Sequence, residues 1–440
     1  MKLKENAKVY ILAPRNIVTG GPTLAHQLCS CLLAHRVNAY MVYYDGGSED
    51  MSEDPVAAEY KKYLLPYVEE LEDNPDNVLV IPETCPKFYN EKRKFHQIMW
   101  WMSVDNYIIR VYNYVLIMLQ RSLCAEASLR AVWGFLDKKD NEQENLAHWV
   151  QSQYAYDFLL KNGVDAKRID FVSDYLEPVY INSIHDGGNT AREDIVLYNP
   201  EKGADFTQLL MEQAPEIQWV PIQNMTPAEV RDLMKKSKVY IDFGNHPGKD
   251  RIPREAAACG CCIITGKKGA ARNAVDVAIP AKYKFADTEE NIPNIIAAIR
   301  SLLKDYPKYI GDYEPYRNKI QAEPKEFITA VEKAFGLSVI QPTLGVAWWG
   351  DVRIGKEMKN IFQPEPYRHY YLCDKNMVEQ EVWRREDDFE YLNEQESIFL
   401  YREKRINKFV VDASDAQSLE RLYQYEVKTE DILVADIEFQ

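Results

Sequence analysis

The 440-residue sequence has a deficit of positive charge, few cysteines and no long apolar run, and each shortage argues against one class of protein. Its 53 Lys and Arg residues face 68 Asp and Glu residues, which gives a formal net charge of −15. A non-specific nucleic-acid binder needs a positive field, so we expect no nucleic-acid partner. Eight cysteines in a chain of this length do not form the disulfide framework of a small secreted domain.

Targeting and membrane-spanning features are also missing from the sequence. Its first residues run straight into an apolar segment, without the apolar core of a signal peptide. No stretch approaches the roughly 20 uncharged apolar residues of a transmembrane helix. We therefore expect a soluble, cytoplasmic protein with reduced cysteines. The 46% hydrophobic and 28% charged fractions are typical of globular proteins, and the length predicts roughly two to four domains.

Apolar runs alternate with helix-like segments over the first part of the chain. The expected strands are residues 8–14, 37–44 and 77–82, and the expected helices are residues 24–34 and 56–71. Strands separated by helical stretches of this length are typical of a parallel sheet with crossover helices. We predict a Rossmann-like domain over residues 1–180, which the resemblance described below makes the acceptor-side domain.

A polar segment, residues 182–193, is the expected linker, and the alternation resumes after it. The expected strands are residues 194–198, 217–221, 238–243 and 261–265, and the expected helices are residues 206–213, 226–236, 292–303 and 324–335, with another beginning at Arg254. Thr226, Pro227 and Glu229 have the spacing of a capping box at a helix start. We predict a second Rossmann-like domain over residues 181–335.

The rest of the chain, residues 336–440, differs in composition. Residues 371–440 hold 9 Lys and Arg residues against 18 Asp and Glu residues, and a solvated acidic face is favoured over a binding tail. Two strand-like runs flank a helix-like segment near the end, which predicts a small appended α/β module. The predicted fold class is thus α/β, with two Rossmann-like βαβ domains facing a cleft and a small C-terminal α/β module.

Loops at the carboxyl edges of two parallel sheets bind ligands, because helix N-termini there direct N–H groups at anions. Gly20 and Gly21 precede the first helix, where glycine lets the backbone approach a ligand; a plain tight turn is the alternative. Asn199 and Lys202 follow the first strand of the second domain, where the ammonium would face a diphosphate. A surface lysine beside a turn is the alternative for Lys202.

A third loop is the densest in charge, and a helix of small residues follows it. Its candidate ligand-binding side chains are His246, Lys249, Asp250, Arg251, Arg254 and Glu255. Arg251 and Arg254 can clamp phosphate oxygens with paired hydrogen bonds, and Glu255 can accept two hydroxyl hydrogen bonds from a ribose. The alternative is a solvated loop held by salt bridges. In the fourth loop, Gly269 and Ala270 can offer backbone N–H groups to phosphate.

These segments together resemble a known family. Residues 238–271 resemble the donor-binding half of GT-B glycosyltransferases, closest to glycosyltransferase family 4: a strand, a polar loop and a small-residue helix that begins near a glutamate. Residues 199–203 are similar to the family's G-R-L-x-x-x-K-G element, and residues 151–169 are similar to its passage before the domain crossover. Gly20 and Gly21 match its acceptor-domain glycine loop. The resemblance covers residues 7–335.

The resemblance implies a nucleotide-sugar donor in the second domain. Lys202 and Arg251 would face its diphosphate, Glu255 its ribose, and Gly269 with Ala270 its phosphate or sugar edge. The sequence departs from the family at one position. Family members carry another glutamate eight residues before the helix glutamate, and Pro247 stands there in this chain, with His246 and Asp250 nearby. The sugar-contacting half of the motif is therefore altered.

Asp105 is the candidate catalytic residue of the first domain, because it follows an aromatic, strand-like run. A carboxylate there could orient or deprotonate an acceptor hydroxyl; helix capping by Ser103 or Asp105 is the alternative.

Cys259, Cys261 and Cys262 straddle a helix end and a strand without a partner pair at zinc-site spacing. We expect no metal and no other cofactor besides the donor itself.

Basic residues precede an aromatic run within residues 87–101, which suggests peripheral contact with an anionic membrane; a surface loop before a core strand is favoured. We predict a metal-independent glycosyltransferase that moves a sugar from a nucleotide-diphosphate donor to a glycan or lipid-linked glycan. The resemblance suggests a role in bacterial surface polysaccharide synthesis, and residues 87–101 suggest a place at the inner face of the cell membrane. The alternatives are a sugar-nucleotide epimerase or sugar-phosphate transferase in the same cleft, and a non-catalytic nucleotide-sugar-binding protein.

Overall fold

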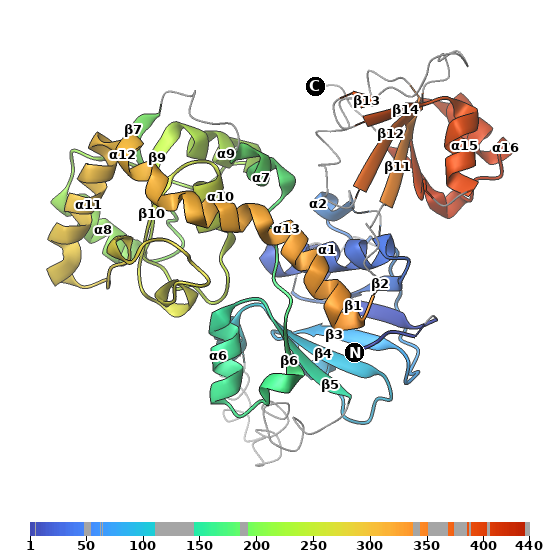
Figure 1. Cartoon of the computed structure of the whole chain (residues 1–440), viewed down its shortest axis with the longest axis horizontal. Helices are drawn as coiled ribbons and strands as arrows, with labels where there is room; N and C mark the ends of the chain where they lie inside the picture. Colours follow the sequence, from blue (N-terminus) through green and yellow to red (C-terminus); the bar gives the residue numbers. More distant parts are fainter. Residues whose placement is uncertain are drawn as a thin grey trace. The chain divides into compact units, whose positions relative to one another are not determined.

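The chain forms two compact units in a computed structural model (Figure 1). The structure describes residues 1–4, 6–47, 54–61, 63, 65–110, 145–184, 192–337, 344–350, 368–373, 385–386, 389–402 and 405–435. One unit joins residues 1–13 to residues 70–336, and the other joins residues 14–69 to residues 337–440. Within the described ranges, no helix combines the length and the apolar character needed to cross a bilayer. The predicted boundaries after residues 180 and 335 stay predictions.

The first unit contains parallel strands from the N-terminal part of the chain. Five of them run in the order β1-β3-β4-β5-β6. They are β1 (Lys8–Pro14), β3 (Val78–Pro82), β4 (His96–Trp101), β5 (Leu146–Val150) and β6 (Ile169–Phe171). These strands are almost entirely apolar because both faces of a parallel sheet are covered. Helix α6 (Gln153–Lys161) follows β5, and α7 (Pro178–Ser183) lies in the segment that leads to the next sheet.

A second parallel sheet of the same unit runs in the order β10-β9-β7-β8. Its strands are β7 (Glu193–Tyr198), β8 (Gln218–Pro221), β9 (Ser237–Asp242) and β10 (Cys262–Thr265). The helices of this region are α8 (Ala204–Gln213), α9 (Pro227–Lys236), α10 (Arg251–Ala258), α11 (Ile292–Lys304), α12 (Tyr306–Tyr309) and α13 (Glu314–Phe335). The capping box of Thr226 and Glu229 is present at the start of α9. The two sheets are separate, as the sequence predicts.

The second unit holds α1 (Gly20–Ala34), β2 (Asn38–Tyr44), α2 (Ala58–Lys61) and a third sheet, in the order β13-β14-β12-β11-β15-β16. The strands of this sheet are β11 (Leu344–Trp349), β12 (Arg368–Cys373), β13 (Arg385–Glu386), β14 (Phe389–Leu392), β15 (Lys408–Asp412) and β16 (Ile432–Ala435). Helices α15 (Glu394–Arg402) and α16 (Ala416–Gln424) lie on the same side of it (Figure 1). The predicted C-terminal α/β module is confirmed, and so is the α/β class with parallel sheets.

The expected helix over residues 56–71 is wrong. Only α2 is helical among the described residues of that segment, and Tyr67 forms a bridge with Met41 of β2 instead. Pro66 explains the difference, because proline lacks a backbone N–H and disfavours helical geometry in the residue before it. Its carbonyl accepts a hydrogen bond from the Met41 N–H at 2.9 Å.

Two helices begin earlier than the sequence predicts. Helix α10 starts at Arg251, so Pro253 lies in its first turn. Helix α13 starts at Glu314 and continues through Pro324. A proline interrupts one helical hydrogen bond, but the preceding turns bury Tyr316 and Ile320 in the core, and this burial favours one continuous helix.

Candidate functional site

Three of the predicted ligand-binding loops contact one another at the carboxyl edge of the second sheet. The Ala270 N–H donates to the His246 carbonyl at 2.8 Å, which joins the loop after β10 to the loop after β9. Gly269 has a φ of 55°, and a Cβ there would lie 2.0 Å from the His246 carbonyl oxygen. A Cβ on Gly244 would lie 2.4 Å from the Lys202 Cβ, which joins the loop after β9 to the loop after β7. Glycine is required at both positions because these backbones touch.

The loop after β7 presents Lys202 from a fixed turn. The Asn199 side-chain oxygen accepts the Glu201 N–H at 3.0 Å, so Asn199 stabilises its own turn. Gly203 follows in the left-handed region, at a φ of 65°. The Lys202 ammonium contacts the Asp250 carboxylate at 2.6 Å; the lysine side chain is 34% exposed and the aspartate side chain 13% exposed. Lys202 is therefore accessible to a ligand and already has an anionic partner.

His246 lies fully buried between two carboxylates. Its Nε2 faces Asp242 at 3.4 Å and its Nδ1 faces Asp250 at 3.5 Å. Burial lowers the pKa of this imidazole, but the two carboxylates outweigh burial and the net shift is upward. Asp242, His246 and Asp250 are close enough to hold a metal ion. Each ring nitrogen faces a different carboxylate, however, and Lys202 already contacts Asp250, so the arrangement suits a protonated imidazole better; the expected lack of a metal stays a prediction.

Arg251 and Glu255 form a pair on the first turns of α10. The Arg251 Nε lies 3.5 Å from the Glu255 Oε1, and both side chains keep some exposure, 18% and 13% respectively. Arg251 Nη1 has no hydrogen-bond partner among the described residues. Burial raises the pKa of Glu255 despite the opposing effect of Arg251. The pair retains hydrogen-bonding capacity for a polar ligand.

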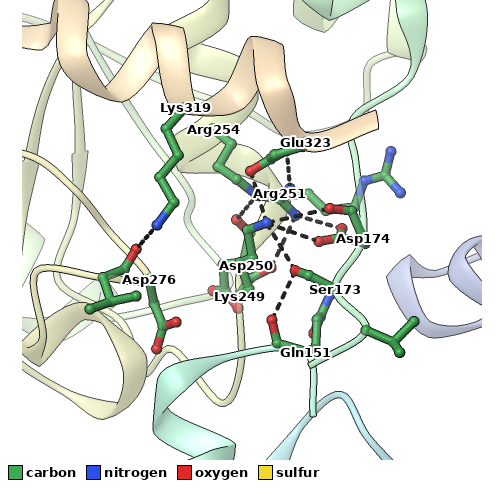
Figure 2. A network of polar contacts seen from close by, with 12 residues as sticks. Gln151, Ser173, Asp174, Lys249, Asp250, Arg251, Arg254, Asp276, Lys319 and Glu323 are labelled. Carbon is green, nitrogen blue, oxygen red and sulfur yellow. Dashed lines mark hydrogen bonds and ion pairs between the residues drawn. The ribbon is translucent and has the colours of Figure 1, made fainter. Parts of the chain in front are cut away.

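Lys249 and Arg254 have a different environment, a buried network of charged side chains (Figure 2). Arg254 contacts Asp174 at 2.5 Å and Glu323 at 2.8 Å. Lys249 contacts Glu323 at 2.8 Å and lies 3.7 Å from Asp174. Burial alone would raise the pKa of Asp174, but Arg254 and Lys249 lower it to about 2. Both cations are therefore neutralised within the protein.

This network connects the loop after β9, which we call the site loop, to two other segments of the chain. Asp174 follows β6, and Glu323 lies on α13, which crosses above the network in Figure 2. A pocket of about 690 Å³ opens beside it. Sequence reasoning missed Asp174 and Glu323 because each lies far along the chain from its partners. The only local signal at Glu323 is its position directly before Pro324, at the edge of the predicted helix over residues 324–335.

Asp105, the candidate catalytic residue, contacts the loop after β9. Its Oδ1 accepts a hydrogen bond from the Tyr154 hydroxyl at 2.7 Å, and its Oδ2 accepts one from the Asn245 side-chain amide at 2.7 Å. Ser103 forms an isolated bridge with Gly248, where a Cβ would lie 2.0 Å from the Met102 carbonyl oxygen. The loop after β4 therefore contacts the loop after β9 directly.

Glu83 is a functional candidate that sequence reasoning missed. It follows β3, is 1% exposed, and accepts a hydrogen bond from the Met102 N–H at 3.0 Å. Burial raises the pKa of Glu83 to about 7. Its carboxyl thus orients the loop that carries Asp105. An acidic residue directly after a buried apolar strand was the only available signal.

Gly20 and Gly21 form the start of α1, in the second unit. Cys259, Cys261 and Cys262 are buried.

Within residues 87–101, the basic side chains are exposed, whereas Phe95, Trp100 and Trp101 are at most 1% exposed and belong to the sheet core. Contact with a membrane through this segment stays a prediction.

Comparison with known proteins gives weak likenesses in structure. No family model matches the chain, and no curated protein matches its sequence. Anabaena HepE in complex with UDP-glucose is 12% identical, with a TM-score of 0.44 over 75% of this chain and 98% of HepE. Sucrose-phosphate synthase from Thermosynechococcus elongatus is 13% identical, with a TM-score of 0.47 over 81% and 99%. WaaG, a glycosyltransferase involved in lipopolysaccharide biosynthesis, is 10% identical, with a TM-score of 0.43 over 76% and 100%. Likenesses of this size carry no functional argument.

Proposed function

We propose that the chain is a glycosyltransferase that moves a sugar from a nucleotide-diphosphate donor to a hydroxyl acceptor. The observation that carries this proposal is the meeting of three loops at one carboxyl edge. They bring Lys202 close to the first turn of α10, which presents Arg251 and Glu255. Partly exposed cations and backbone N–H groups at such an edge are what a diphosphate needs.

Each predicted donor contact has a definite role in this proposal. Lys202 and Arg251 bind the diphosphate, and Glu255 accepts hydrogen bonds from the ribose hydroxyls. The loop of Gly269 and Ala270 lies against the loop after β9 and supports it, because the Ala270 N–H donates to the His246 carbonyl and is therefore not available to a phosphate. Lys249 and Arg254 shape the loop through their buried ion pairs, since their charges are balanced by Asp174 and Glu323.

The reaction then depends on electrostatic stabilisation of the leaving group. As the bond between the sugar and the diphosphate breaks, negative charge grows on the departing oxygen, and Lys202 and Arg251 stabilise it. Asp105 orients the acceptor hydroxyl or accepts its proton, and Tyr154 and Asn245 hold the carboxylate in place. No metal is required in this scheme, because side chains supply the positive charge.

The finer assignments belong to the same proposal. Membership of glycosyltransferase family 4 and a GT-B arrangement are supported by the motif resemblance of residues 238–271 and 199–203. A glycan or lipid-linked acceptor, in bacterial surface polysaccharide synthesis, follows from that resemblance. Action in the cytoplasm at the inner membrane face is supported by exposed basic side chains within residues 87–101.

Calorimetric titration of the full chain with UDP, GDP, dTDP and ADP tests the donor site. We expect one of them to bind, and Glu255→Gln to weaken that binding at least tenfold with an unchanged thermal midpoint. Product analysis with the matching nucleotide sugar tests the transfer, since a transferase consumes an acceptor and an epimerase does not. Binding unaffected by Glu255→Gln would contradict the assigned role, and the absence of binding by all four would contradict the proposal.

A further inference from the structure

The ion pair between Lys202 and Asp250 lies at the centre of the proposed diphosphate site. Its two charged groups are 2.6 Å apart, so the cation assigned to the ligand is held by an anion of the protein. The lysine side chain is the more exposed partner, at 34% against 13%. An incoming anion therefore reaches the ammonium from solvent, while the carboxylate stays mostly covered.

The backbone around this pair has little freedom to move. A Cβ on Gly244 would lie 2.4 Å from the Lys202 Cβ, and a Cβ on Gly203 would lie 2.6 Å from the Phe243 carbonyl carbon. These contacts fix the position of both loops, so only the lysine side chain can rotate away. Asp250 is the N-cap residue of α10, but its side chain makes no capping hydrogen bond and is directed to Lys202.

A second group that can carry positive charge, the His246 imidazole, lies behind the Asp250 carboxylate. The Nδ1 of buried His246 is 3.5 Å from the Asp250 Oδ2, and its other nitrogen faces Asp242. Asp242 is itself held by the Gly244 N–H and the Tyr240 hydroxyl, both at 2.9 Å. A carboxylate that loses its only cation in a covered position is costly. His246 reduces that cost when Lys202 leaves.

We propose that Asp250 is an internal counter-anion that occupies Lys202 until the diphosphate of a nucleotide ligand displaces it. This inference rests on the proposed function. Asp250 then lowers the affinity for nucleoside diphosphates, whereas the sequence analysis counts it among the candidate ligand-binding side chains. The ligand must compete with a carboxylate already in place, and His246 stabilises Asp250 after the exchange.

Calorimetric titrations of the full chain with UDP, GDP, dTDP and ADP test the inference. Asp250→Asn removes the competing charge and keeps a good N-cap residue, so we expect the best-bound nucleotide to bind about three- to tenfold more tightly. Asp250→Ser serves as a second variant with the same expectation. Glu201→Gln is the matched control, because Glu201 is an exposed acid adjacent to Lys202 in the sequence and its removal should leave the affinity unchanged.

The same substitution in a Lys202→Gln background separates displacement from simple charge repulsion. If Asp250 acts by holding Lys202, Asp250→Asn changes the affinity less than about twofold once Lys202 is absent. Equal tightening in both backgrounds overturns the inference, and so does weaker or unchanged binding by both Asp250 variants. These results leave the proposed function intact if the native chain binds a nucleotide. Failure of every variant and of the native chain to bind any of the four overturns both.

Discussion

Two pairs of cations around the same site loop have opposite environments. Lys249 and Arg254 are at least nine-tenths buried and are neutralised by Asp174 and Glu323. Lys202 and Arg251 are partly exposed. We call the first the buried pair and the second the accessible pair. All four cations follow strands of the same sheet, so this position alone does not show which of them is available to a ligand. Their burial and the charges of their partners show it.

Arg254→Met should give the largest effect. It leaves Asp174 and Glu323 with a single cation in a covered position, and breaking a buried ion pair from one side costs about 3–5 kcal/mol. Urea unfolding of the variant should therefore show this loss of free energy of unfolding. The same change at Lys202 should cost less than the change at Arg254, because Lys202 is partly exposed and His246 stays beside Asp250. Equal costs at both positions would remove the distinction between the two pairs.

Asp105, which contacts the loop after β9 through Asn245, should control turnover rather than stability. Asp105→Asn keeps the side-chain shape but removes the charge and the basicity, so turnover should fall about 100-fold or more while nucleotide affinity stays within about twofold. Steady-state kinetics with the nucleotide sugar identified by calorimetry provide the measurement. A fall in nucleotide affinity with turnover unchanged would assign Asp105 to the donor site rather than to the acceptor.

Glu83 provides a pH-dependent test of the region beneath Asp105. The pKa of Glu83 is about 7 in the folded chain, above the ordinary glutamate value of 4.5. Between these values the folded state keeps a proton that the unfolded state has lost, so stability falls as pH rises through this window. Glu83→Gln removes this dependence, and at pH 8 it should be more stable than the native chain by on the order of 1–3 kcal/mol.

Thermal unfolding of both proteins between pH 4 and pH 8 checks this expectation. The two curves should converge below pH 4.5, where the native glutamate is protonated in both states. A native chain whose stability rises with pH across the window, relative to the variant, would contradict the assigned protonation of Glu83.

Asp174 should have the opposite pH dependence, with a smaller effect over the accessible range. Arg254 and Lys249 outweigh burial and lower its pKa to about 2, below the ordinary aspartate value of 3.8. The stability that Asp174 contributes is therefore present above pH 3.8 and is lost as pH falls toward 2. Asp174→Asn should flatten the acid limb of the unfolding curve. An unchanged acid limb would contradict the strength of the buried pair.

Local patterns were sufficient to predict most of the strands. β1 matches its expected range fully, and the Thr226 capping box is present, because both depend on neighbours within a few residues. The helix expected over residues 56–71 failed because Pro66 and a bridge to β2 outweigh its periodicity. Only some strands of the C-terminal module's sheet were predicted, because its aromatic strands lack a clear alternation of apolar and polar residues.

The sequence predicted the candidate site residues from their positions after strands, but it did not predict which side chains they pair with. Lys202 and Asp250 are 48 residues apart, and Arg254 and Asp174 are 80 apart, so no local pattern pairs them. The sequence therefore predicted the loops that meet, but not the division into a buried and an accessible pair. That division depends on the segment after β6 and on α13, whose approach to the loop is a property of the tertiary structure.

Calorimetric titration of one nucleoside diphosphate into the native chain, Lys202→Gln and Lys249→Gln tests the central claim most directly. The account predicts that the native chain binds, that Lys202→Gln weakens binding at least tenfold, and that folded Lys249→Gln retains affinity within about threefold despite a lower thermal midpoint. Loss of affinity in Lys249→Gln together with full affinity in Lys202→Gln would contradict it.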